Sequence, residues 1–277
     1  MKSRKTRMKI PTVMKYLVLS IWAVIDIYPL FWVVMSSLKD KISVIARPLA
    51  LPTTLRFQSY VEAWIDGNIG QNFMNTVLYS ACSVALIALF SSMAAFALTR
   101  IVRSKLLSGY FTLGIMIPAH GILIPCFIIM KQLHLYNNRL GFIILMVAAN
   151  LSLSIFVLTS FMKSIPMELD EAAVIDGCSY RRLYVQIILP LAKPGIATIC
   201  TLALLNCWNE YLHAYIMLQK ENLRVITQGI FALQGRYATN YSALCAGLVI
   251  SILPMMLFFV LFQEQVIGGM TAGSVKG

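Results

Sequence analysis

The sequence predicts an all-α integral membrane protein with six transmembrane helices, and three observations predict it. Hydrophobic residues make up 59% of the 277 residues and charged residues only 12%, whereas soluble domains have about 25% charged residues. Six stretches of about 20 residues are almost free of charge, and basic residues gather at their ends. The chain has too few polar residues to cover the surface of a soluble globular protein. It also has far too many apolar residues for a disordered chain, so both classes are excluded.

Each predicted span is a long apolar segment with polar flanks. The six spans are Tyr16–Ser37, Thr76–Leu98, Leu106–Met130, Leu140–Met162, Gly195–Leu218 and Ser242–Phe262. The first follows a basic leader, but it is too long for the apolar part of a signal peptide and no small-residue cleavage site follows it. We therefore expect a retained anchor. Only two spans contain a charge, Asp26 in the first and Glu210 in the fifth.

The spans define the organisation of the chain and its orientation. We expect a cytoplasmic N-terminus, first span and extracytoplasmic loop in 1–70, a five-helix core with a long cytoplasmic loop at 163–193 in 71–263, and a cytoplasmic tail in 264–277. With both termini inside, 14 basic residues lie on the cytoplasmic side and 9 outside, which is the usual bias of a multi-pass protein of the cell membrane. This arrangement also accounts for the net charge of +12 without a nucleic-acid partner.

The loop at 163–193 carries the clearest local pattern. Pro166 stands near the start of a predicted helix, and Glu168, Asp170 and Glu171 follow where the helix dipole favours acids. Gly177 is placed to end that helix in the left-handed conformation. A second, amphipathic helix begins at Ser179. Its apolar face is formed by Tyr180, Leu183, Tyr184 and Ile187. These features predict a docking element for a cytoplasmic partner, with a hairpin that merely caps the bundle as the alternative.

The same residues resemble a known signature. The run Glu171-Ala172-Ala173-Val174-Ile175-Asp176-Gly177, followed by Ile188-Leu189-Pro190, resembles the EAA motif of binding-protein-dependent ABC importer permeases. Trp208-Asn209-Glu210 and the ending 269–277 are similar to the sugar-importer branch of that family, the MalG-like permeases. The resemblance extends over nearly the whole chain.

The resemblance implies a type I ABC importer permease, with Glu171, Ala172, Ala173, Asp176 and Gly177 on the coupling helix. It implies four kinds of partner: a second homologous permease, two ABC ATPase subunits, an extracytoplasmic sugar-binding protein and membrane lipid. ATP and Mg would be bound by the ATPases. This agrees with the sequence, which has no GxxxxGK[ST] phosphate loop, so we expect a transport subunit and not an enzyme, with no cofactor of its own.

Substrate-facing residues are predicted at two places. Charges inside a membrane are candidates for function, so Asn206, Trp208, Asn209 and Glu210 are expected to line the substrate path. For Glu210, a role in holding helices together is equally open, and for Asp26 that structural role is favoured. The segment Gln219–Tyr241 is long for a helix connector. The family resemblance implies that it reaches the binding protein, with Gln234, Gly235, Arg236 and Tyr237 as contacts.

Two other classes of protein compete with an importer subunit. A stand-alone ion-coupled secondary transporter would use Asp26 and Glu210 as ion sites, but such transporters commonly contain repeats and no convincing repeat is present. A non-transporting membrane scaffold would need its ATPase partner for another purpose. The six cysteines contain no CxxC pair and are expected to fill space in the core, with no metal site and no disulfide framework.

Overall fold

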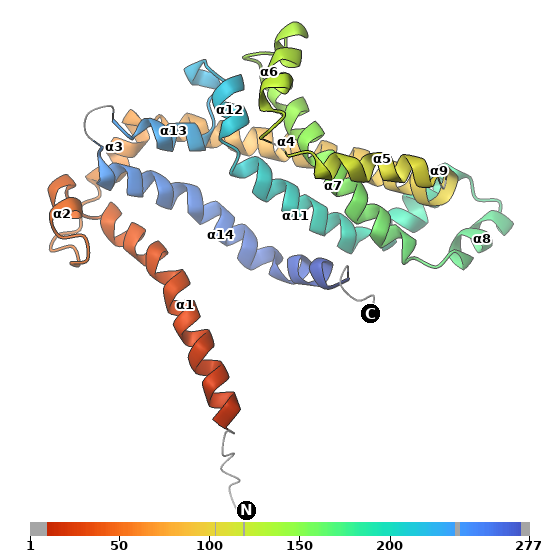
Figure 1. Cartoon of the computed structure of the whole chain (residues 1–277), viewed down its shortest axis with the longest axis horizontal. Coiled ribbons are helices and arrows are strands. Elements are labelled where there is room, and N and C mark those ends of the chain that lie inside the picture. The colour runs from red at the N-terminus through yellow and green to blue at the C-terminus, as the bar shows by residue number, and fades with distance from the viewer. Residues whose placement is uncertain (1–9, 103, 119, 236–238, 273–277) are drawn as a thin grey trace, which may run out of the picture. The chain divides into compact units, whose positions relative to one another are not determined.

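The computed structural model describes residues 10–102, 104–118, 120–235 and 239–272, and every regular element in them is a helix (Figure 1). These residues form two compact units. One consists of the residues up to Ile69 together with Ile230–Ile252, and the other of Gly70–Gly229 together with the residues from Leu253 onward. The loop at 163–193 and the predicted substrate-path residues lie in the second unit.

Four of the predicted spans are continuous helices. They are α1 (Ile10–Ser37), α4 (Ile69–Phe96), α7 (Arg139–Lys163) and α14 (Tyr241–Ala272). Each contains a segment that is long and apolar enough to cross a membrane, because about 20 residues of helix span the hydrocarbon layer. The first, second, fourth and sixth predictions are therefore confirmed as helices.

The third predicted span, Leu106–Met130, is wrong as a single helix. The structure has α5 (Lys105–Met116) and α6 (Leu123–Gln132) instead. Ile117 between them is extended, with φ −74° and ψ 120°, because proline disfavours helical backbone in the residue that precedes it. The amide of Gly121 then donates to the Pro118 carbonyl at 2.9 Å and forms a turn. Pro118 thus interrupts an otherwise apolar run.

The fifth predicted span, Gly195–Leu218, is also interrupted. It consists of α11 (Lys193–Trp208) and α12 (Leu212–Met217). Before α11 come three short pieces. They are α9 (Tyr180–Arg182), the π-helical turn η2 (Leu183–Ile188) and α10 (Leu189–Leu191). The segment Tyr180–Leu191 makes an angle of 74° with α11. The chain therefore bends sharply where Pro190 and Pro194 predicted a break.

The first unit contains α2 (Lys41–Ala46) and α3 (Gln58–Asp66) after α1. The Glu62 carboxylate joins its parts, since it lies 3.5 Å from Lys41 Nζ and accepts a 2.7 Å hydrogen bond from Asn240 Nδ2. In contrast, the membrane-spanning part of α1 is not buried within this chain, and Asp26 on it is exposed. Among the described residues of this chain, the Asp26 side chain therefore has no partner that would give it the expected structural role.

In the second unit α7 is the central helix, with α5 and α11 packed against it (Figure 1). Close approach depends on small residues. A Cβ at Gly195 of α11 would lie 2.8 Å from the Phe161 ring, and a Cβ at Gly114 of α5 would overlap Ser152 of α7. The core around α7 includes the fully buried Leu158 and Met162.

A second contact in this unit joins α4 to the segment after α12. That segment forms the 3₁₀ turn η3 (Glu221–Leu223) and α13 (Ile226–Ala232). Asn75 Nδ2 donates to the Asn222 and Arg224 carbonyls at 3.0 Å each, and the Tyr79 hydroxyl donates to the Leu223 carbonyl at 3.1 Å. Side chains of α4 thus satisfy carbonyls of a connector that was predicted as a loop.

The C-terminal segment continues the last helix. The sixth span was predicted to end at Phe262, whereas α14 continues to Ala272. The expected tail at 264–277 is therefore helical over 264–272, and 273–277 lie outside the described residues. Each residue added to an existing helix gains one hydrogen bond without a new nucleus, so the glycines at 268 and 269 do not stop it.

Candidate functional site: a clamped surface helix and a polar cavity

The predicted coupling element forms the helix α8 (Glu168–Ile175), with its acids in the first turn. The helix ends as expected at Gly177, which has φ +74°. The amide of Cys178 donates to the Ala173 carbonyl at 2.8 Å, and that of Gly177 donates to the Val174 carbonyl at 3.0 Å. This pair of bonds is a Schellman motif, so the glycine sets the direction in which the chain leaves α8.

The faces of α8 are divided between packing and exposure. Ala173 is buried, while Glu171, Ala172, Asp176 and Gly177 are exposed. Val174 and Ile175 are 60% and 85% exposed. Adjacent apolar side chains exposed among polar residues often mark an interaction site. The exposed end of α8 therefore has the composition of a surface that a partner covers.

A buried ion pair holds the other end of α8. Arg100 comes from the π-helical turn η1 (Ala97–Ile101) that ends α4. Its Nε lies 2.6 Å from Asp170 Oδ2, and the two side chains are only 3% and 10% exposed. Arg100 Nη2 also donates to the Ile165 carbonyl at 3.0 Å, and Nη1 lies 3.0 Å from the Met167 sulfur. We call these contacts of Arg100 the Arg100 clamp.

The second helix of the loop is attached to the same region. Ser179 caps it, as its hydroxyl accepts from the Arg182 amide at 3.4 Å. Tyr184 bonds Ser92 of α4 at 2.8 Å between the hydroxyls, and its ring lies 5.1 Å from that of Phe96. Tyr180, in contrast, is 60% exposed. The predicted apolar face is correct for Leu183, Tyr184 and Ile187 but not for Tyr180, which is the first residue of this helix.

The polar residues of the predicted substrate path border one cavity of about 660 Å³. It lies where α11 ends and α12 begins. Its polar lining consists of His120, Asn150, Asn206, Asn209, Glu210, Tyr211 and His213. Three of the four predicted path residues are thus brought together, and four further polar residues join them.

Hydrogen bonds connect the polar side chains around this cavity. Asn206 Nδ2 donates to Asn150 Oδ1 at 3.0 Å, which links α11 to α7. Glu210 Oε1 accepts from the His213 amide at 2.9 Å and lies 3.1 Å from His213 Nδ1. The Glu210 carboxylate therefore caps the first turn of α12 and positions the imidazole as well. Both readings of Glu210, cavity lining and structural support, fit this geometry.

Trp208 does not line the cavity. It is 5% exposed, and its ring packs edge-on against Phe73 of α4, with centroids 5.6 Å apart and planes at 84°. Of the four residues predicted for the substrate path, Trp208 is therefore the one that does not border this cavity. A helix places successive side chains about 100° apart, so neighbours in a sequence motif face different surroundings.

The sequence analysis missed the contributions of Asn150, His213 and Arg100. Asn150 is a polar residue within an apolar predicted span, and His213 is one helical turn after Glu210, so both left a signal. Arg100 was assigned to the close of the second span and counted among its basic flanks, and no contact with the loop at 163–193 was predicted for it.

The predicted contacts to a binding protein are only partly described. Gln234 and Gly235 are exposed after α13, and Arg236 and Tyr237 lie outside the described residues. All six cysteines are free. Among the described residues no group of three or more His, Cys, Asp or Glu side chains is arranged to hold a metal ion.

A family model described as "Binding-protein-dependent transport system inner membrane component" matches residues 86–270. The match includes both α8 and the polar cavity. The diacetylchitobiose uptake system permease protein NgcG of Streptomyces coelicolor is 33% identical to the chain over 262 residues, which cover 93% of this chain and 87% of that protein.

Two further similarities extend over nearly the full length. The probable starch degradation products transport system permease protein AmyC of Thermoanaerobacterium thermosulfurigenes is 34% identical over 269 residues, covering 95% of this chain and 98% of that protein. A chain in the crystal structure of a bacterial ABC transporter involved in import of the acidic polysaccharide alginate has a TM-score of 0.80 at 24% identity, with 95% and 98% covered. The latter shows a shared fold.

Proposed function

Because this chain belongs to the family of binding-protein-dependent transport system inner membrane components, we propose that it is the permease subunit of an ATP-driven importer of sugars, oligosaccharides in particular. The chain is a transport subunit rather than an enzyme. The sugar class is supported by two relatives named as permeases for diacetylchitobiose and for starch degradation products. The single observation that carries the proposal is the match of the family model to residues 86–270, which include α8 and the polar cavity.

The proposal includes a type I permease with six membrane crossings and both termini in the cytoplasm. Four long helices supply four crossings. The third would use α5 with α6, and the fifth α11 with α12. At 1.5 Å per residue, the two parts of each pair add up to about 33 Å, close to the hydrocarbon thickness of about 30 Å. The 74° bend before α11 supports a surface position for Tyr180–Leu191.

In the proposed mechanism α8 docks in a groove of an ATPase subunit. Glu171 and the exposed Val174 and Ile175 would contact that groove. The Arg100 clamp joins α8 rigidly to the end of α4, so movement of the ATPase would pull on a membrane helix. Without such a connection a short surface helix would tilt freely, since isolated helices of this length are unstable.

The polar cavity is proposed as this subunit's part of the substrate path. Its amide, carboxylate and imidazole groups offer both donors and acceptors, which suits the hydroxyls of a sugar. The partners would be a second homologous permease, two ATPase subunits and an extracytoplasmic sugar-binding protein. The ion-coupled alternative is disfavoured, because the relatives are uptake-system permeases and Glu210 is engaged by His213.

Purification of a tagged chain from its native membrane tests the proposal. We expect ATPase subunits to copurify and ATP hydrolysis to accompany them, and we expect Glu171→Lys to lose both while the protein still inserts. Asp66→Lys, the same charge reversal at an exposed position of α3, is the matched control and should retain them. Uptake that persists without ATP and follows an ion gradient would refute the proposal in favour of the secondary transporter.

A further inference from the structure

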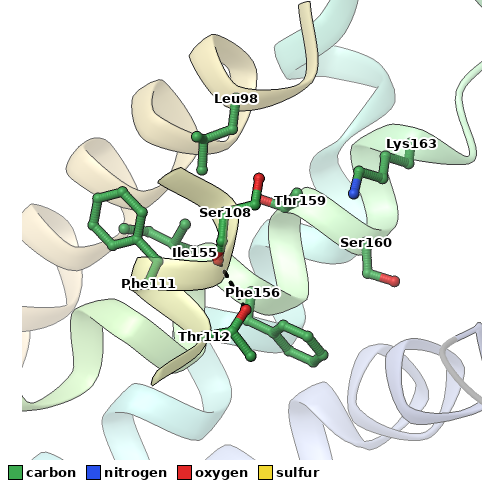
Figure 2. A pocket seen from close by; sticks show the side chains of 9 residues that line it. All are labelled: Leu98, Ser108, Phe111, Thr112, Ile155, Phe156, Thr159, Ser160 and Lys163. Atoms are coloured by element: carbon green, nitrogen blue, oxygen red, sulfur yellow. Dashed lines mark hydrogen bonds between the residues drawn. The ribbon is translucent and has the colours of Figure 1, made fainter. Parts of the chain in front are cut away.

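Two adjoining cavities lie between α5, the end of α4 and α7, away from the polar cavity described above. One measures about 230 Å³ and the other about 550 Å³. They share Leu98, Ser108 and Lys163 as lining residues, so they lie next to each other, and we call the two together the α5–α7 pocket. Figure 2 shows the smaller cavity, with side chains from α5 and α7 around it.

The wider end of the α5–α7 pocket is basic. Lys105 at the start of α5 and Lys163 at the end of α7 both line it, and Figure 2 shows the Lys163 amine directed back toward the pocket. Arg100 also lines it, but Asp170 neutralises that charge. No carboxylate is among the described residues that line either cavity. Two ammonium groups without a counter-charge favour an anionic ligand.

Hydroxyl groups line the space between the two lysines and the narrower end. Thr159 is the informative one, since it is 7% exposed and its Oγ1 has no hydrogen-bond partner in the described part of the chain. A buried hydroxyl without a partner costs about 1–3 kcal/mol. Ser108 and Ser160 line the same cavity as Thr159. The pocket therefore offers at least one hydroxyl donor, that of Thr159, which no described residue of the chain engages.

The narrower end is mainly apolar, and Phe156 in it is 48% exposed. Phe111 of α5 and Ile155 and Phe156 of α7 line it. Beyond these residues Gly114 lets α5 approach Ser152 of α7 so closely that a Cβ would overlap it, and this contact ends the gap between the helices. The pocket thus has a basic, hydroxyl-rich mouth and an apolar floor.

We propose that the α5–α7 pocket binds an anionic phospholipid, with its phosphate between Lys105 and Lys163 and an acyl chain against Phe111 and Phe156. Basic pockets between membrane helices on the cytoplasmic side bind lipid phosphates, and the proposed orientation places both lysines on that side. Thr159 and Ser108 donate to the phosphate or its glycerol ester oxygens. A free phosphate ion satisfies the mouth of the pocket but leaves the apolar floor without a ligand.

The test uses the purified protein with its copurifying subunits in a neutral detergent, titrated with dioleoylphosphatidylglycerol, dioleoylphosphatidylcholine or sodium phosphate. Binding is read from native mass spectrometry and from the thermal unfolding midpoint. We expect phosphatidylglycerol to bind more tightly than phosphatidylcholine. Equal binding of the two lipids overturns the proposal, and displacement of phosphatidylglycerol by millimolar phosphate alone shows that the site is for the free ion.

Charge variants locate the site. Each lysine near a lipid phosphate contributes about fivefold to binding, so Lys105→Gln with Lys163→Gln should weaken phosphatidylglycerol about 25-fold. Lys131→Gln, an exposed lysine at the end of α6, is the control and should leave binding unchanged. If the double variant binds like the control, the proposal fails. This readout involves neither sugar nor ATP, so its failure is separate from failure of the proposed transport function.

Thr159→Val gives a second test that does not depend on charge. Valine has nearly the shape of threonine but no hydroxyl, so it removes the unused donor. We expect the variant to unfold at the same or a higher temperature without lipid and to gain less from phosphatidylglycerol than the wild type. A variant that is less stable without lipid, yet gains as much from it, would show that the hydroxyl has a partner inside the protein.

Discussion

Removal of Arg100 should detach α8 while the rest of the fold remains. The Arg100 and Asp170 side chains are 3% and 10% exposed, with Nε and Oδ2 2.6 Å apart. Arg100→Met removes the buried cation that lies against the Asp170 carboxylate, and loss of one partner of a buried ion pair costs about 3–5 kcal/mol. It also removes the donors to the Ile165 carbonyl and the Met167 sulfur. The cheapest response is for α8 to leave its site, since water then solvates the carboxylate.

Amide hydrogen exchange of α8 measures this effect directly. A loss of about 3 kcal/mol corresponds to exchange about 100-fold faster at the amides of Glu168–Ile175. Arg100→Met combined with Asp170→Leu should be milder than Arg100→Met alone, about tenfold, because no charge is left buried. Arg181→Met, an exposed arginine in the same loop, is the control and should show no change.

Two results would refute the reasoning. Exchange in α8 that is the same in Arg100→Met and in the wild type would mean that other contacts hold the helix. A double variant whose exchange rises by the product of the two single effects would mean that Arg100 and Asp170 act independently, in spite of the 2.6 Å between them.

Three further predictions concern the loop, the cavity and the tail. Gly177→Pro should abolish transport with insertion intact. Gly177→Ala should cost only about 1–2 kcal/mol of loop stability, because the φ of +74° at this position is strained for alanine while the added Cβ meets no atom within 4 Å. Equal transport by the two variants would contradict this prediction. Asn206→Leu should raise the half-saturating sugar concentration of transport, since it leaves Asn150 Oδ1 without its 3.0 Å donor; an unchanged value would place the cavity off the sugar path. Deletion of Thr271–Gly277 should weaken ATPase association without impairing insertion, and wild-type assembly and transport by the truncated chain would show that this segment is dispensable.

The sequence predicted the helices whose apolar runs have no interruption. α1, α4, α7 and α14 lie close to their predicted positions, because uninterrupted hydrophobicity over about 20 residues permits few structures other than a spanning helix. The end of α8 was predictable for a similarly local reason. Gly177 takes the left-handed conformation with little penalty, so the residue type and its place after an amphipathic run were sufficient.

The breaks in the third and fifth spans were less accessible. Pro118 was visible, but proline is tolerated in membrane helices when neighbours satisfy the freed backbone groups, so its effect depended on the surroundings. The break between α11 and α12 has no proline at all. It depends on the Glu210 carboxylate, which bonds the His213 amide, and on Thr227, whose hydroxyl donates to the Glu210 carbonyl at 2.9 Å.

Hydrophobicity, charge placement and turn residues act over short stretches of chain, so they were sufficient to predict a multi-span membrane protein with an EAA-type loop. The polar contacts between distant residues became visible in the folded structure alone. Arg100 reaches Asp170 across 70 positions of sequence, and Asn150 meets Asn206 across 56. Each of these side chains has many possible partners in an apolar interior, where a polar group must find one. The packing of α8 against the end of α4 and of α11 against α7 brings one partner within 3.0 Å of each. The spacing of these residues in the sequence does not predict that packing.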